Sequence, residues 1–422
     1  MFKKIILKNG LRLIFAPSKN TEITTVLVMV GTGSRYESEK LNGISHFLEH
    51  IFFKGTKKRP TALSISTEMD KVGAEFNAFT GKDATGFYIK ADASHFPLAL
   101  DVISDILLNS KFSSEEINRE RGVILEEMKM VQDTPMHYVG DLFEKLLYKS
   151  DSLGNLIIGT EKNILNFKRD DFADYFNKHY TTENTVVCVA GKIGSIENLT
   201  KVVEKHFKKI KNGEKQKIKI ANTEQEKPQV LLHHKKTDQA HFCLGVRGYG
   251  LSDKRRWALK LLSIILGGNM SSRLFIEVRE RRGLAYYVRT AYQGYTDCGY
   301  LATQAGVDKN NIEQVIKIIL REYKKIAENG VKKDELQKAK DYIKGASAIS
   351  LETSDQIASF LTNQEILLNK ISSPKEHFAK IDKITASDIQ ETARDIFTNQ
   401  KLNLTIIGEY KDKKKFERIL KL

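Results

Sequence analysis

The stretch His46-Phe47-Leu48-Glu49-His50 decides which fold and chemistry this chain is expected to have. Its two histidines lie four positions apart, and a glutamate stands just before the second. Residues at i and i+4 of an α-helix share a face, so both imidazole rings can reach one metal ion, with Glu49 close beside them. This H-x-x-E-H order is the inversion of the commoner zinc-protease motif. The pattern predicts zinc, an activated water molecule and hydrolysis of a peptide bond.

The residues around the motif favour a helix. Asn42 to Ser45 offers a turn and polar side chains suited to a helix start, and Gly55 is suited to its end. An apolar stripe runs through the segment at Ile44, Phe47, Leu48 and Ile51. The plainer alternative is that the two histidines belong to an ordinary half-buried helix without a metal.

A catalytic zinc site needs a third protein ligand and one open position for water. The best candidate lies in a second predicted helix, which begins at Ser113 because Ser113 and Glu116 have the spacing of a capping box. Residues with helical spacing mark the buried stripe of this helix: Ile117, Ile124, Met128 and Val131.

Two glutamates lie along the edge of that stripe. At about 100° per residue, Glu127 falls roughly 60° from Ile124, at the edge of the stripe, whereas Glu126 falls roughly 200° away and points toward water. Glu120 precedes Glu127 by seven residues and shares the same edge. Half-buried carboxylates need partners, and a metal with its ligand histidine would provide them. The alternative is that both glutamates pair with arginines such as Arg119 or Arg121.

Other motifs extend this pattern over nearly the whole chain. They are Gly33 to Glu37, Asn42 to Thr56, Gly73 to Thr85 and Glu120 to Met128 in the first half, and Gly267 to Phe275 and Glu277 to Val288 in the second. With these motifs the chain resembles the M16 metallopeptidases, the pitrilysin and insulinase family. The resemblance is greatest to the short members related to the mitochondrial processing peptidase, and particularly to its beta subunit.

The resemblance implies a role for each matched residue of the zinc site. His46, His50 and Glu127 would bind one Zn²⁺ per chain, and Glu49 would be the general base. The position of Glu127 agrees with the helical-face argument above. Glu120 would be a helper carboxylate that stands behind the ligands.

The resemblance also implies how a peptide would be held. Asn77 and Ala78 would lie on an edge strand that pairs with an extended substrate. Arg279 and Tyr286, in the second half, would grip the substrate. Charge alone does not single out Arg279, because this arginine and its neighbours could equally form a solvated basic helix end before Gly283. Where related chains often carry His-Pro, this chain has Ser152, to which we assign no role.

The organisation of the chain indicates an α+β fold built by duplication. Apolar runs flank Asn9-Gly10 as in a hairpin, and later strand and helix patterns of the first half recur in the second. We expect two homologous domains, each an antiparallel sheet packed with helices. The boundaries are 1–210 for the zinc-binding domain, 211–228 for a polar linker, and 229–422 for the domain with Arg279 and Tyr286. The second copy has no H-x-x-E-H.

Composition limits the function classes. The 422 residues carry a formal net charge of +15, which raises the alternative of a basic protein for nucleic acid or anionic membranes. The lysines are spread along the chain, so we favour a solvated surface and expect no nucleic-acid or membrane partner. Cys188, Cys243 and Cys298 are widely spaced, which favours buried thiols in a reducing compartment, and we expect a cytoplasmic protein.

These observations predict a zinc-dependent endopeptidase that hydrolyses peptides or short unfolded segments inside a closed chamber. Short members of this family pair face to face, so we expect a homodimer, with a heterodimer with a related chain as a further possibility. The main alternative is a non-catalytic partner subunit of such a heterodimer. That alternative predicts missing ligands, whereas all four residues of the zinc site are present.

Overall fold

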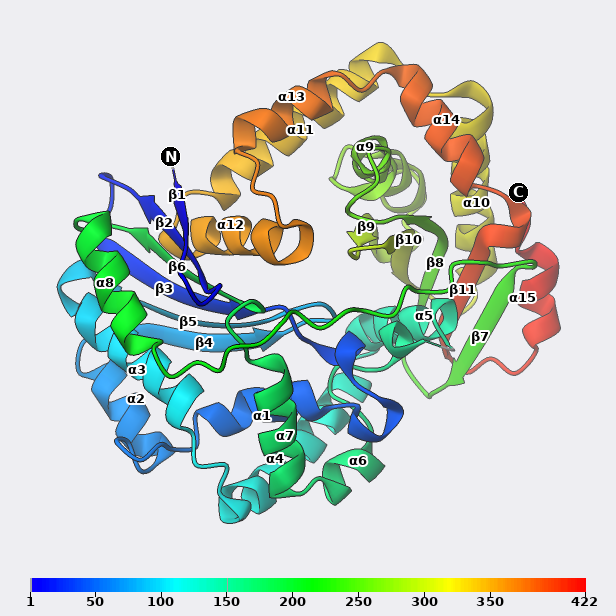
Figure 1. Cartoon of the computed structure of the whole chain (residues 1–422). Helices are drawn as coiled ribbons and strands as arrows, with labels where there is room; N and C mark the ends of the chain where they lie inside the picture. Colours follow the sequence, from blue (N-terminus) through cyan, green and yellow to red (C-terminus); the bar gives the residue numbers. More distant parts are fainter. Residues whose placement is uncertain (1, 150) are drawn as a thin grey trace. The chain divides into compact units, whose positions relative to one another are not determined.

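The structure is a computed structural model that describes residues 2–149 and 151–422; Met1 and Ser150 lie outside the described residues. The chain divides into two compact units. Unit 1 comprises Met1–Met128, Asn155–Lys219 and Ala348–Ile371, and unit 2 comprises Lys129–Gly154, Ile220–Ser347 and Ser372–Leu422. Each unit contains one sheet packed with helices, which confirms the expected α+β class (Figure 1). The consecutive domains 1–210 and 229–422 stay a prediction, because each unit takes a segment from the other half.

Unit 1 is built on a six-stranded sheet with β4 at one edge. The predicted hairpin at Asn9-Gly10 is present, and Gly10 adopts the left-handed φ of 87° that such a turn requires. The pairs are antiparallel except that β2 runs parallel to β6. In spatial order the strands are β1 (Lys3–Ile6), β2 (Arg12–Pro17), β6 (Thr185–Gly191), β3 (Ile23–Val30), β5 (Thr85–Asp92) and β4 (Glu75–Thr80).

The two faces of this sheet carry separate cores. Alternate residues of a strand point to opposite faces, so Val26 and Val28 join one apolar cluster while Leu27 and Met29 join another. The first cluster is covered by helices of the first half: α1 (Ile44–Phe52), α2 (Ala62–Asp70), α3 (Phe96–Asn109), α4 (Ser114–Gln132), α6 (Glu161–Asn166), α7 (Arg169–His179) and α8 (Ile196–His206). The second cluster is covered by α12 (Ser354–Leu368), a helix from the second half (Figure 1).

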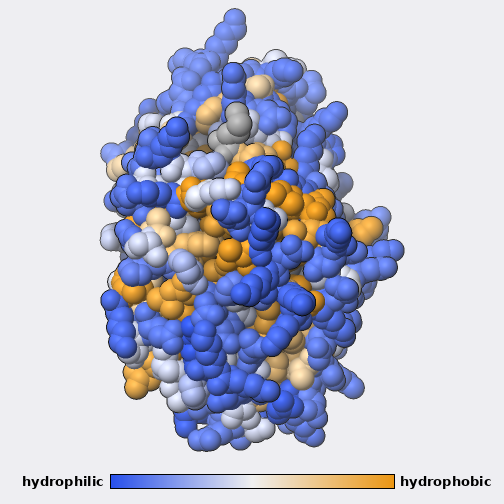
Figure 2. Space-filling model, turned by 60° about the vertical axis from the view of Figure 1, so that its left-hand side comes forward, coloured by the Kyte–Doolittle hydropathy of each residue, from blue (hydrophilic) through white to orange (hydrophobic). Residues whose placement is uncertain are grey.

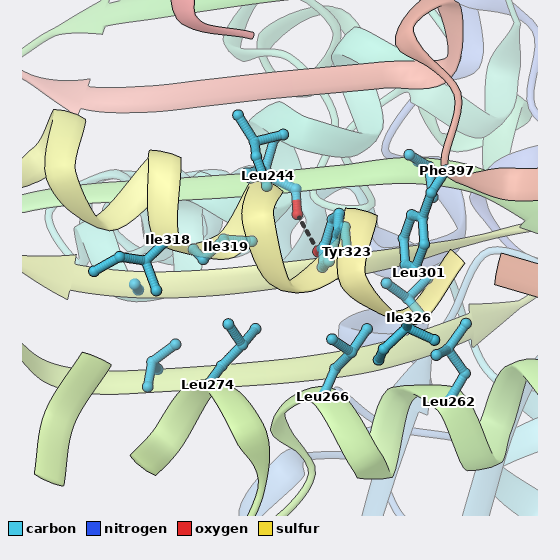
Figure 3. Close-up of a cluster of buried hydrophobic side chains, with 14 of the residues drawn as sticks. Leu244, Leu262, Leu266, Leu274, Leu301, Ile318, Ile319, Tyr323, Ile326 and Phe397 are labelled. Atoms are coloured by element: carbon cyan, nitrogen blue, oxygen red, sulfur yellow. Dashed lines mark hydrogen bonds between the residues drawn. The ribbon is translucent and has the colours of Figure 1, made fainter. Parts of the chain in front are cut away.

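Unit 2 repeats the design with a five-stranded sheet in the order β7 (Gln229–His234), β11 (Leu402–Gly408), β8 (Ala240–Tyr249), β10 (Cys298–Val307) and β9 (Ala285–Gly294). Only the pair β11 and β7 is parallel among these described strands. The main helices of the unit are α9 (Arg256–Gly267), α10 (Ile312–Asn329), α11 (Lys333–Ser350), α13 (Pro374–Asp382), α14 (Ala386–Ile396) and α15 (Lys413–Ile419). In the core, the Tyr323 hydroxyl donates a hydrogen bond to the Leu244 carbonyl, and its ring stacks on Phe397 (Figure 3).

Each sheet is completed by a helix from the other half of the chain. In unit 1, buried Glu365 of α12 accepts a hydrogen bond from Arg12 of β2 at 3.1 Å. In unit 2, α5 (Pro135–Leu147) lies on the sheet, and its Glu144 accepts hydrogen bonds from the hydroxyls of Tyr295 and Tyr300. Residues 212–228 of the predicted linker form neither helix nor strand, and its first residue, Lys211, makes an isolated bridge with Thr181.

The three cysteines are buried, as expected, and form no disulfide with one another in the described part of the chain. Seen from one side, the surface is mainly hydrophilic and is interrupted by a band of hydrophobic residues (Figure 2). Within the described ranges, no helix is long and apolar enough to cross a membrane.

Candidate metal centre

Gly43 directly precedes the motif helix α1 and has a left-handed φ of 103°, which suits glycine. Because glycine has no side chain, it cannot cap the helix itself. The buried carboxylate of Glu37 does this instead. It accepts hydrogen bonds from the backbone N–H groups of Gly43 and Ser45, both at 2.8 Å, and from the Asn42 side chain at 3.0 Å. Burial raises the pKa of Glu37, although these donors oppose the shift. Glu37 therefore fixes the start of the helix that carries both motif histidines.

The three expected ligands come together in unit 1. The Nε2 atoms of His46 and His50 each lie 3.5 Å from a different oxygen of Glu127. One ligand atom from each residue can be chosen so that all lie within 4.8 Å of one another. A separation of 3.5 Å is longer than a good N–H···O bond, but it matches the edge of a tetrahedron with bonds of about 2.1 Å. The donor set of two imidazoles and one carboxylate therefore fits Zn²⁺ with a position left for water.

The second glutamate of α4 stands behind His50. Glu120 is buried, and its Oε1 lies 2.9 Å from His50 Nδ1. This contact leaves His50 Nε2 free to face Glu127, which is how carboxylates commonly orient metal-binding histidines. The other oxygen of Glu120 pairs with Lys54 Nζ at 2.6 Å. Burial alone would raise the pKa of Glu120, but the His50 and Lys54 contacts outweigh it and lower that pKa.

Electrostatics favour a charged Glu127. The neighbouring His46 ring lowers the pKa of Glu127, against a smaller opposing effect of burial. Burial by itself would lower the pKa of His46, but the Glu127 carboxylate raises it overall. A half-buried anion surrounded by imidazoles is an environment that favours a divalent cation.

Glu49 projects from α1 toward the edge strand β4. Its Oε2 accepts a hydrogen bond from the hydroxyl of Thr80, the last residue of β4. Along this strand Glu75, Asn77 and Phe79 are exposed, whereas alternate residues ending in Thr80 are half-buried. Glu49, the candidate general base, is therefore hydrogen-bonded to β4, the strand that the sequence predicts to bind a peptide.

Asn77 and Ala78 lie in the middle of β4, which pairs only with β5 among the described strands. The free side of an edge strand presents unpaired N–H and C=O groups. Here the Ala78 N–H donates to the side-chain oxygen of Asn77 at 2.8 Å. The position of both residues on an edge strand agrees with the expectation from the sequence, and their contact with a substrate stays a prediction.

Arg279 and Tyr286 lie in unit 2 and are close to each other. The Arg279 guanidinium carbon is 6.0 Å from the centre of the Tyr286 ring and 5.1 Å from that of Phe275. Tyr286 is 70% exposed. It stands where the register between β9 and β10 shifts, and such a bulge turns a side chain outward. The neighbouring Arg281 and Arg282 instead pair with Glu277.

The sequence left open that Glu120 and Glu127 pair with nearby arginines, but the described contacts of Arg119 and Arg121 are with other groups. Arg119 pairs with Glu115 and Glu116, and Arg121 donates to backbone carbonyls near α6.

The sequence interpretation missed three residues that support the site: Glu37, Lys54 and Thr80. Lys54 follows His50 by four residues, which is a helical spacing that could have pointed to it. Glu37 and Thr80 belong to matched motifs, but their partners are fixed by tertiary structure.

The fold and the site define a two-unit α+β protein with a candidate metal centre at the H-x-x-E-H motif. Comparisons with known proteins identify its family. Residues 13–161 match the family model described as "Insulinase (Peptidase family M16)", and residues 166–343 match "Peptidase M16 inactive domain". The uncharacterized zinc protease YmxG of Bacillus subtilis is 36% identical over 94% of this chain and 96% of its own. An uncharacterized zinc protease of Streptomyces coelicolor is 35% identical over 97% and 90%. The chain belongs to the insulinase family of peptidases, family M16.

Solved structures show the same fold. A protease from Helicobacter pylori superposes with a TM-score of 0.90 at 24% identity, over 96% of this chain and 99% of its own. A peptidase M16 inactive domain from Pseudomonas fluorescens gives 0.90 at 17% identity, over 97% and 98%. A chain of complex III2 from Candida albicans gives 0.86 at 19% identity, over the full length of both.

Proposed function

We propose that this protein is a zinc-dependent endopeptidase that hydrolyses peptides or short unfolded segments. The observation that carries this proposal is the convergence of His46, His50 and Glu127, with Glu49 beside them on α1. The relatives named zinc proteases support the assignment, as does membership of family M16.

The zinc residues and Glu49 would have separate roles in hydrolysis of the peptide bond. Zn²⁺ held by His46, His50 and Glu127 would supply a Lewis acid that acidifies water and polarises a carbonyl. Glu49 takes a proton from the attacking water as general base. As the water oxygen bonds to the carbonyl carbon and the C–N bond breaks, Glu49 returns that proton to the leaving nitrogen.

The substrate would be bound mainly through its backbone. An extended peptide that added to β4 beside Asn77 and Ala78 would hydrogen-bond to the free strand edge, a mode that reads backbone shape more than side-chain identity. Arg279 and Tyr286 would donate hydrogen bonds to substrate carbonyls as negative charge develops on them.

We also propose that two chains assemble as a homodimer that encloses the substrate in a chamber and operates in the cytoplasm. The zinc residues of one chain would then meet Arg279 and Tyr286 of the partner chain, and both sets are present in this sequence. Analytical ultracentrifugation should show an active dimer. A stable monomer with full peptidase activity would contradict the proposal.

The replacement Glu49→Gln tests the catalytic mechanism. It keeps the shape of the side chain and removes the base, so we expect zinc content to stay unchanged and cleavage of a fluorogenic peptide to fall by about 100-fold or more. Chelation should stop the wild-type enzyme, and added zinc should restore it. Undiminished cleavage by the variant would rule out Glu49 as the base.

The second candidate is a non-catalytic subunit of a heterodimer. It is favoured by the match of residues 166–343 to an inactive domain of the family. It predicts that the purified chain cleaves no peptide, with or without added zinc, and that cleavage after a related chain is added does not require Glu49.

A further inference from the structure

We propose that Thr80 is a positioning residue that holds the carboxylate of Glu49 in its working orientation. This inference rests on the proposed peptidase function and assigns a part in it to a residue outside the metal ligands and the base. It is carried by the hydrogen bond from the Thr80 hydroxyl to Glu49 Oε2 and by the place of Thr80 at the end of β4.

Glu49 has little else to restrain it. Among the residues that the structure describes, Thr80 is the one hydrogen-bond donor to this carboxylate, whereas the Glu120 carboxylate is held by both His50 and Lys54. A glutamate side chain has several rotatable bonds, so an unrestrained one spends part of its time in orientations that cannot take the proton. The Thr80 bond engages Oε2 and leaves Oε1 for the attacking water.

Thr80 is itself fixed by the sheet. It pairs across the strands with Thr85, whose hydroxyl donates to the Thr32 carbonyl at 2.9 Å, and the turn that follows is closed by a hydrogen bond from Gly81 N to Ala84 O at 2.8 Å. Its side chain shares a face of β4 with Ala78, about 7 Å away along the strand. A donor built on a paired strand is more rigid than one on a loop, which suits a positioning role.

The position on β4 also links substrate binding to the base. A peptide that adds to the free edge near Asn77 and Ala78 is placed in register with the same strand that holds Glu49. Binding and proton transfer would then share one rigid element, so a bound peptide bond meets a base that is already oriented. Alignment of this kind contributes strongly to rate because displacements of about 1 Å cost up to about 100-fold.

The experiment compares Thr80→Val, which has the same shape without the hydroxyl, with Thr80→Ser, which keeps it. We expect Thr80→Val to lower kcat by about 10- to 100-fold, with KM within about twofold of wild type and zinc content unchanged. Thr80→Ser should stay within about threefold of wild type. Thr67→Val, on the exposed side of α2, controls for a threonine-to-valine change elsewhere in the fold and should have no effect.

A double mutant decides whether Thr80 acts through Glu49. If it does, adding Thr80→Val to Glu49→Gln should cause no further loss of kcat, because the base that Thr80 positions is already gone. A further loss of similar size would overturn the proposal. So would an unchanged kcat in Thr80→Val, a loss of zinc in that variant, or a rise in KM alone, which would make Thr80 a peptide-binding residue. Failure of the peptidase function itself would be seen separately, as a wild-type protein without chelator-sensitive cleavage, and it would remove this inference as well.

Discussion

At the scale of single residues, the convergence of the three candidate metal ligands could be predicted from the sequence, because their geometry is local. His46 and His50 lie on one helix. Glu127 lies at the edge of the buried stripe of α4 and is half-buried in the structure. Thr80 is different, because it lies 31 residues from Glu49 and meets it only once β4 is packed beside α1. No periodicity in the sequence encodes such a contact.

The pair Glu126 and Glu127 offers a matched test of ligand identity. Glu127→Gln should lower zinc affinity by more than the 10- to 100-fold typical of residues behind the ligands, because it removes a charged oxygen from the ligand set. Glu126→Gln removes the same charge from the exposed side of the same helix turn and should leave the affinity unchanged. Titration with zinc and a competing chelator measures both. Equal effects in the two variants would show that net charge, not ligation, holds the metal.

At the scale of elements, a buried polar chain joins α1 to α7. The Tyr175 hydroxyl lies 2.8 Å from Ser45 Oγ and 2.9 Å from Thr32 Oγ1. Ser45 directly precedes the candidate ligand His46. His179, one turn along α7, stacks on Tyr175 at 4.2 Å and places its Nδ1 3.2 Å from Thr32 Oγ1. The apolar stripe predicted that α1 would be half-buried, but it did not predict which helix would lie behind it.

This arrangement predicts that the stability of unit 1 falls in acid. Burial, with a smaller effect of Lys178, lowers the pKa of His179 from 6.5 to about 4. Between these pH values His179 is protonated in the unfolded chain but not in the folded chain. The free energy of unfolding therefore falls as pH drops from 6.5 toward 4, by up to about 3 kcal/mol. Urea unfolding of the metal-free protein across this range measures the effect. His179→Gln should flatten the slope, and an unaltered slope would assign the acid sensitivity to other groups.

At the scale of the whole molecule, the duplication was visible in the sequence, whereas the exchange of helices was not. The strand patterns of β6 and β11 resemble each other, and the structure places both in the interior of their sheets. The helices α5 and α12 each have a buried face, but an apolar face does not specify which sheet it covers. Their partners are set by contacts such as that between Arg12 and Glu365, 353 residues apart.

The exchange predicts that the chain stays assembled after it is cut between its halves. A specific protease site inserted between Asn222 and Glu224, in the exposed stretch without helix or strand, should allow complete cleavage. The two pieces should still elute together, because α12 of the second piece completes the core of unit 1 and α5 of the first completes that of unit 2. These contacts bury apolar side chains such as Leu361 and Ile366, so 1 M salt should not separate the pieces, whereas urea should. Separation in native buffer would mean that each half folds around its own core and that the exchanged helices contribute little to stability.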